Sequence, residues 1–155
     1  MRKTSALIAL AAVVTACTTA SAAHAEGENL GLVGISLAHA TIDTATLGGV
    51  CKYVRDAVGV GGSGITYHLV GAGSAGGAYN GIPVVATGIR CRLKLPTVTV
   101  TSGPEYLPGA ASETNVDYST NDASGGLICT TVYGVLRQTP PGETDNLINT
   151  PETCA

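Results

Sequence analysis

The stretch Thr87-Gly88-Ile89-Arg90-Cys91-Arg92-Leu93-Lys94-Leu95 decides the fold class of this chain. Its odd-numbered residues are mainly apolar and include Cys91, whereas its even-numbered residues are one glycine and three cations. Successive side chains of a β-strand point to opposite faces of the sheet. The stretch therefore predicts a strand over 87–95, with one face in an apolar core and one basic face in water.

A second strand is predicted over 127–137, where both faces are largely apolar and a central position in a sheet is expected. Five further strands are predicted at 32–39, 50–55, 65–70, 98–101 and 115–118. Turns rich in Gly, Pro, Asn, Asp or Ser separate them, and no segment after Glu26 keeps a helical period. The pattern predicts an all-β, immunoglobulin-like sandwich of about seven strands.

The N-terminal segment has the organisation of a secretion signal. The cations Arg2 and Lys3 precede an apolar run over 6–14, and small residues lead to Ala23-His24-Ala25. We expect a signal peptide over 1–25 and one secreted domain over 26–155. The apolar run is about ten residues, too short for a transmembrane helix, which needs roughly 20, and no later segment comes closer.

An alternative for this segment is a lipid anchor. Val14-Thr15-Ala16-Cys17 resembles a lipobox, in which the cysteine is acylated and becomes the new N-terminus. The chain would then be attached to the cell surface through Cys17. Either processing route leaves the same four later cysteines.

The composition favours a core that needs covalent support. Phe and Trp are absent, so Val, Ile, Leu, Ala and some of the six Tyr must fill the interior, and most of these bury less apolar area. The cysteines Cys51, Cys91, Cys129 and Cys154 allow three pairings in an exported chain. The tail over 138–155 has little β pattern; it is anchored if Cys154 pairs with Cys129, and Cys51 then pairs with Cys91.

A resemblance rests on the order of the cysteine segments. After the signal peptide come Val50-Cys51-Lys52-Tyr53, Gly88-Ile89-Arg90-Cys91, Ile128-Cys129-Thr130 and Thr153-Cys154-Ala155. This order resembles small Ala/Gly-rich exported proteins of high-GC Gram-positive bacteria. The resemblance implies a β-sandwich with two disulfides in the pairing just described, and it implies no activity.

Two Gly-x-Gly-x-x-Gly matches, over 59–64 and 71–76, are interpreted as loops. A dinucleotide site needs a following helix and an acidic residue that binds the ribose. The segment over 77–83 is not helical in pattern, and no Asp or Glu lies between Asp56 and Glu105. No cofactor is predicted.

No catalytic or metal site is predicted either. Ser74 lies in a degenerate nucleophile elbow, which we interpret as a flexible turn because the large α/β sheet of a hydrolase is missing. His39 and His68, with Asp43 nearby, lack the close spacing of zinc ligands and are expected to be solvated. The segment over 117–122 fails the EF-hand pattern and is interpreted as a turn.

Arg90, Arg92 and Lys94 form a basic stripe in a chain where 11 acidic residues outnumber 8 basic ones. The stripe could contact a polyanion such as a cell-wall teichoic acid. The plainer interpretation is a solvated sheet face whose cations keep an edge strand from pairing with other chains. The acidic balance argues against nucleic acid as a partner.

The leading functional prediction is a secreted or envelope-associated, non-enzymatic binding or structural module with an extracellular or cell-wall partner. One alternative is a protease inhibitor or toxin-like effector that presents the segment over 102–110 as a rigid loop. A small-ligand carrier with a cleft between the sheets is the second alternative. The third is a small hydrolase that unites Ser74, a histidine and a carboxylate.

Overall fold

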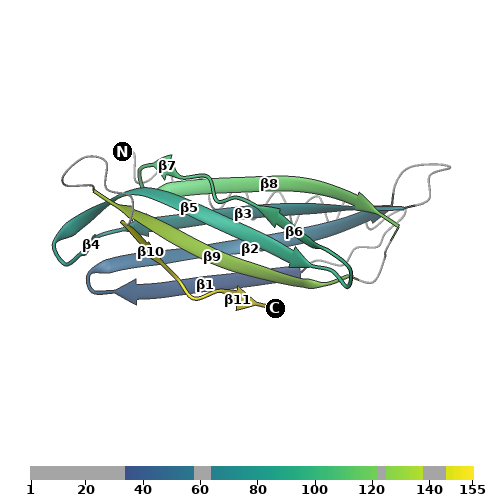
Figure 1. Cartoon of the computed structure of the whole chain (residues 1–155), viewed down its shortest axis with the longest axis horizontal. Coiled ribbons are helices and arrows are strands. Elements are labelled where there is room, and N and C mark those ends of the chain that lie inside the picture. The colour runs from purple at the N-terminus through teal and green to yellow at the C-terminus, as the bar shows by residue number, and fades with distance from the viewer. Residues whose placement is uncertain (1–33, 58–63, 122–124, 138–145) are drawn as a thin grey trace.

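The computed structural model describes residues 34–57, 64–121, 125–137 and 146–155, which form two β-sheets and contain no helix. The first sheet has the order β1-β2-β3-β8, formed by β1 (Gly34–Ile42), β2 (Ala45–Ala57), β3 (Ile65–Gly76) and β8 (Ala111–Thr120). Figure 1 shows the long strands of the two sheets stacked as an elongated sandwich. The all-β prediction is therefore confirmed. No segment of this described part is a helix that could cross a membrane.

The second sheet is built around β5 (Ile82–Lys94) and β9 (Leu127–Leu136), which pair with each other in antiparallel register. β5 also pairs with β4 (Ala78–Tyr79), β6 (Thr99–Ser102) and β7 (Leu107–Pro108). β9 also pairs with β10 (Leu147–Asn149) and β11 (Thr153–Cys154). Both strands are therefore bonded on two sides, and the central position predicted for 127–137 is confirmed.

Each of the seven predicted strands overlaps one of the observed strands β1, β2, β3, β5, β6, β8 and β9. The four short strands β4, β7, β10 and β11 were not predicted, and two of them, β10 and β11, lie in the tail, which the bridge between Cys129 and Cys154 anchors. These strands are only two or three residues long, too short to show an alternation of apolar and polar residues in the sequence. They become strands because an edge of β5 or β9 supplies their hydrogen-bond partners.

The alternation predicted for β5 determines which of its side chains enter the core. Thr87, Ile89, Cys91 and Leu93 are fully buried, while the cations between them are only partly covered. The first sheet contributes Tyr53 and Tyr67, whose rings lie 6.0 Å apart. Tyr53 donates its hydroxyl to the carbonyl of Gly126, and the hydroxyl of Tyr67 accepts from the amide of Gly125. Buried tyrosines with bonded hydroxyls thus fill part of the space left by the missing Phe and Trp.

The two disulfides have different positions in the sandwich. Cys51–Cys91 joins β2 to β5 across the core, with both residues fully buried and a Cα–Cα distance of 5.6 Å. Cys129–Cys154 joins directly opposite residues of β9 and β11, 4.1 Å apart at Cα. The first bridge locks the sheets together, and the second fastens the C-terminal residues to the second sheet.

The prediction of a loop over 71–76 is wrong, because these residues form the second half of β3. Gly71 lies opposite Cys51 and is buried, and a Cβ at this position would collide with Sγ of Cys91. The glycines thus allow close packing in a strand, a use that a Gly-x-Gly pattern does not reveal. Gly59, Gly61, the signal segment and Cys17 lie outside the described residues.

Candidate functional site

Arg90, Arg92 and Lys94 lie on the outer face of the second sheet. They alternate with the buried residues of β5 and are 29%, 30% and 40% exposed. β5 is bonded on both sides, so the stripe does not protect an edge strand, and that interpretation is wrong. The three cations lie on a central strand, and the hydrogen bonds on both sides of that strand fix the spacing between them.

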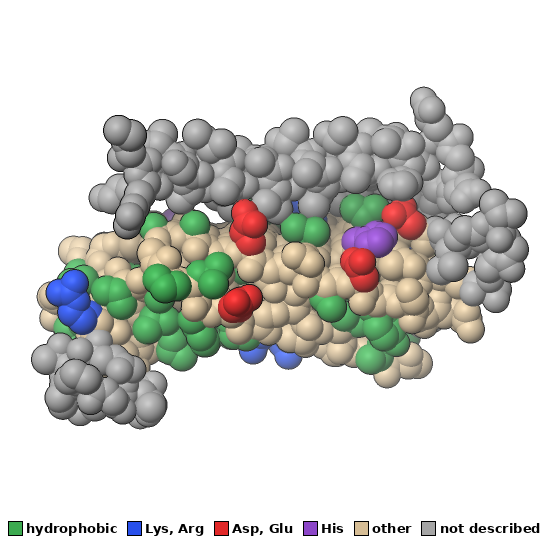
Figure 2. Space-filling model, turned by 90° about the horizontal axis from the view of Figure 1, so that it is seen from above, with side chains coloured by type: hydrophobic (Ala, Val, Ile, Leu, Met, Phe, Trp, Pro, Cys, Tyr) green, Lys and Arg blue, Asp and Glu red, His purple; other side chains and the backbone are tan. Residues whose placement is uncertain are grey.

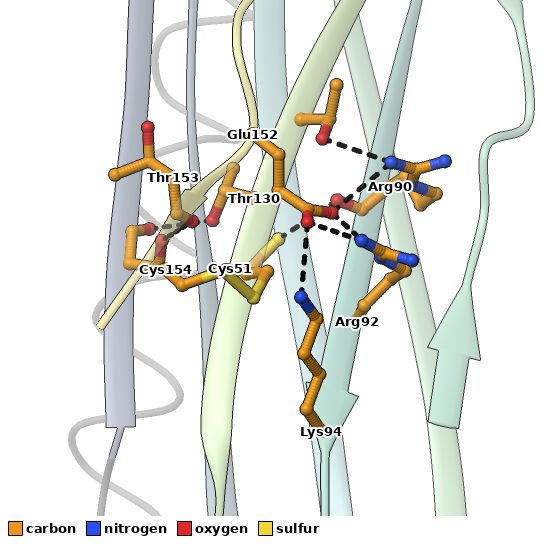
Figure 3. Close-up of a disulfide and its surroundings, with 11 residues drawn as sticks. Cys51, Arg90, Arg92, Lys94, Thr130, Glu152, Thr153 and Cys154 are labelled. Carbon is orange, nitrogen blue, oxygen red and sulfur yellow. Dashed lines mark hydrogen bonds and ion pairs between the residues drawn. A yellow bond between two sulfur atoms is a disulfide. The ribbon is translucent and has the colours of Figure 1, made fainter. Parts of the chain in front are cut away.

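A single carboxylate, that of Glu152, bonds all three cations, as Figure 3 shows. Its Oε2 accepts from Nε of Arg92 at 2.7 Å and from Nη2 of Arg90 at 3.2 Å. Its Oε1 accepts from Nη2 of Arg92 and, at 3.5 Å, from Nζ of Lys94. Arg92 therefore holds the carboxylate with two donors of one guanidinium fork, which is the strongest geometry for such a pair.

The pairing of the C-terminal strands with β9 brings Glu152 to this position. Before it, Thr150 is fully buried and exchanges hydrogen bonds with Val132: its amide donates to the Val132 carbonyl, and its Oγ1 accepts from the Val132 amide. After it, Cys154 is bridged to Cys129, which lies directly opposite Arg92. With Thr150 and Cys154 both fixed to β9, Glu152 lies over the face that carries the cations.

The ion pairs change the titration of both partners. The hydrogen bond from Arg92 is the main cause that lowers the pKa of Glu152 below its ordinary value. The same bond raises the pKa of Arg92. Glu152 is therefore ionised at neutral pH, and one carboxylate opposite three cations leaves an excess of two positive charges.

Two tyrosines extend this surface. The guanidinium carbon of Arg90 lies 5.9 Å from the ring centre of Tyr133, within cation–π range. Tyr133 meets Tyr106 edge to face, with ring centres 6.0 Å apart. Tyr106 fits because Gly88 lacks a side chain, since a Cβ there would lie 2.7 Å from the ring. Partial burial raises the pKa of Tyr106, although 42% of the residue is exposed.

We call the surface formed by Arg90, Arg92, Lys94, Glu152, Tyr106 and Tyr133 the cationic face. It combines charged donors with aromatic surface that is accessible to solvent. Such a surface can hold an anion through the cations and a sugar or polyol through the rings. It carries no group arranged as a nucleophile with an adjacent base.

A second polar cluster lies on the outer face of the first sheet. His68 contacts Asp117 through Nδ1 at 2.8 Å and Asp56 through Nε2 at 3.1 Å. Figure 2 shows a histidine among acidic side chains on the face it presents, with Lys and Arg near its margins. Both ring nitrogens are engaged, so His68 is not the simply solvated side chain that was expected. Two carboxylates therefore flank one imidazole in this cluster.

Of the other candidate residues, His39 and Ser74 lie opposite Gly48 on the two strands that flank it, while His68 and Asp43 lie elsewhere. His39 is exposed and lies opposite Gly48, whereas His68 lies opposite Val54, roughly 20 Å further along β2 at about 3.3 Å per residue. Asp43 accepts from the amide of Asn80. Ser74 is a strand residue whose hydroxyl donates to the carbonyl of Gly48 at 3.5 Å, so the flexible turn predicted there is wrong.

Neither of two groups of potential metal ligands forms a metal site in the described part of the chain. Cys129, Glu152 and Cys154 place potential ligand atoms within 4.8 Å of one another. Both sulfurs belong to a disulfide and are not available as thiolates. Residues 117–120 are part of β8 rather than the predicted turn, and Asp122 lies outside the described residues.

The segment between β6 and β8 is held at several points. Ser112 donates its hydroxyl to the Glu105 carbonyl, Thr87 donates to the Gly109 carbonyl, and the Gly109 amide donates to the Val85 carbonyl. Glu105 and Tyr106 are exposed between these contacts. These contacts and the pairing of β7 with β5 hold the segment in an exposed position.

Sequence reasoning found the three cations but not Glu152, Tyr106 or Tyr133. Local spacing contains no signal for them, because Glu152 lies 60 residues after Arg92 in the chain. Comparison with protein-family models, curated proteins and solved structures finds no match.

Proposed function

We propose that the chain is an exported, non-enzymatic binding module whose cationic face binds an envelope polymer with repeated phosphate groups, such as a teichoic acid. One observation carries the proposal: three cations converge on one carboxylate, beside the exposed Tyr106 and the half-buried Tyr133. Guanidinium forks match phosphate oxygens, and the aromatic rings suit a sugar or polyol between the phosphates. Two disulfides and the absence of a transmembrane helix in the described ranges are compatible with an extracellular location.

The proposed fold is immunoglobulin-like. Two pairs of strands support it, β3 with β8 in one sheet and β5 with β9 in the other. In the immunoglobulin arrangement the corresponding pairs are B with E and C with F. Sandwiches of this kind are used for recognition in antibodies, where a rigid scaffold positions the binding loops.

The test is a binding titration of the purified protein, with both disulfides formed, against fluorescently labelled inorganic polyphosphate. The double variant R90Q/K94Q removes two cations and keeps the pair between Arg92 and Glu152, so the C-terminal strands stay in place. We expect its affinity to fall about tenfold at low salt, and the wild-type affinity to decrease as the salt concentration rises. Arg137→Gln, at an exposed position after β9, removes one charge away from the face and serves as control.

Two results would refute this function. One is wild-type protein that binds neither polyphosphate nor purified teichoic acid at millimolar concentration. The other is a folded R90Q/K94Q variant that binds as tightly as the wild type. Circular dichroism of each variant establishes that it is folded.

A second candidate function, protease inhibition, is favoured by the fixed loop that exposes Glu105 and Tyr106. A loop that is already rigid loses little entropy when it binds. A panel of serine proteases assayed with micromolar protein tests this candidate. Complete absence of inhibition excludes it.

A further inference from the structure

We propose that Glu152 occupies the anion site of the cationic face as an internal competitor, and that reduction of the Cys129–Cys154 disulfide opens this site. The proposal rests on the proposed function and concerns the regulation of the same face. The group that replaces Glu152 is an oxyanion with at least two free oxygens, such as a phosphodiester.

The geometry of Glu152 is that of a bound ligand. Each of its oxygens bonds two cationic side chains, and the donors come from Arg90, Arg92 and Lys94. A phosphate of an incoming polymer needs the same donors. Polymer and Glu152 therefore compete for one position, and Glu152 has the advantage of belonging to the same chain.

That advantage depends on how firmly residues 152–155 are held. Glu152 precedes Cys154 by two residues, and β11 itself is only two residues long. Besides the disulfide, this end is held by the Ser36 hydroxyl on the Thr153 carbonyl and by two hydrogen bonds between Ala155 and Ile128. The disulfide is the one covalent tie, and without it the local concentration of Glu152 at the cations falls.

The two disulfides differ in accessibility to a reductant. Cys154 is exposed, whereas Cys51 and Cys91 are fully buried between the sheets. A dithiol reductant attacks Sγ of Cys154 with one thiolate, and Cys129 leaves as a thiolate. The second thiol of the reductant then displaces Cys154, so both cysteines become thiols and the reductant becomes a disulfide. Cys51–Cys91 remains oxidised and holds the sandwich together.

The experiment measures binding to labelled polyphosphate before and after treatment with a dithiol, for the wild type and Glu152→Gln. Glu152→Gln should bind about tenfold more tightly than the oxidised wild type, because the competitor has lost its charge. Dithiol should raise the wild-type affinity and leave that of Glu152→Gln unchanged. The double variant C129S/C154S should bind like the reduced wild type, and alkylation of the reduced wild type should modify Cys129 and Cys154 but not Cys51 and Cys91.

Glu113→Gln is the matched control, since it removes one negative charge from an exposed position of β8 in the other sheet. If Glu152→Gln and Glu113→Gln have the same effect, Glu152 is not a competitor and the proposal is overturned. It is also overturned if dithiol raises the affinity of Glu152→Gln, or if alkylation modifies Cys51 and Cys91 as readily. If neither the wild type nor Glu152→Gln binds polyphosphate in any state, the proposed function itself fails.

Discussion

Gly71 lies directly opposite Cys51 on the neighbouring strand, and its missing side chain leaves the space that the sulfur atoms of the Cys51–Cys91 bridge occupy. Backbone and disulfide are in close contact at this point. The bridge can join the two sheets only because β3 has no side chain here. A glycine that looks like part of a loop motif is therefore a requirement of the core.

Gly71→Ala should destabilise the protein by about 1–3 kcal/mol, because the new methyl group collides with the bridge. Urea denaturation of the oxidised protein measures the loss. Gly76→Ala is the control on the same strand: no atom lies within 4 Å of its Cβ position, and a change within about 0.5 kcal/mol is expected. Equal stability of the two variants would contradict the close packing of Gly71 against the sulfurs.

Removing the Cys129–Cys154 bridge should cost about 3 kcal/mol of stability, since it closes a loop with a sequence separation of 25. Removing Cys51–Cys91 should cost more, because its separation is 40 and its sulfurs are buried. The measurement compares urea denaturation of C129S/C154S with that of C51A/C91A. A larger loss in C129S/C154S would contradict the structural roles assigned to the two bridges.

Stability should depend on pH through Glu152, whose pKa the Arg92 hydrogen bond lowers from its ordinary value of 4.5. The ionised form is favoured in the folded state, so this contribution is complete above pH 4.5 and is lost as the pH falls through the lower pKa. The free energy of unfolding of the wild type should exceed that of Glu152→Gln near neutral pH, and the difference should shrink in acid. Urea titrations between about pH 2 and pH 7 test this. A difference that does not vary with pH would refute the ion pairs.

Gly88→Ala should displace the ring of Tyr106, which would lie 2.7 Å from the new methyl group. Partial burial raises the pKa of Tyr106, so displacement toward water should bring that pKa back toward 10.0. An ultraviolet titration of tyrosinate formation measures the shift, and Tyr106→Phe identifies the step that belongs to Tyr106. An unchanged titration curve in Gly88→Ala would show that Tyr106 does not lie against Gly88.

The alternation of apolar and charged residues in 87–95 was sufficient to predict a strand, its buried face and its basic face. Period-two patterns are local, so the seven longer strands could be located from them. Glu152 could not be predicted as the partner of the three cations on β5. Its position depends on the pairing of β11 with β9 across 25 residues of sequence. The strand nature of 71–76 was also missed, since glycine is depleted in strands and common in turns, so that a glycine-rich segment predicts a loop.

Nuclear magnetic resonance of the arginine Nε–H groups during a titration with polyphosphate tests the central claim most directly. If the cationic face binds phosphate, the resonances of Arg90 and Arg92 will shift and saturate together, while that of Arg137 will not move. Saturable binding with no change at Arg90 and Arg92 would place the polymer elsewhere on the protein and contradict the account.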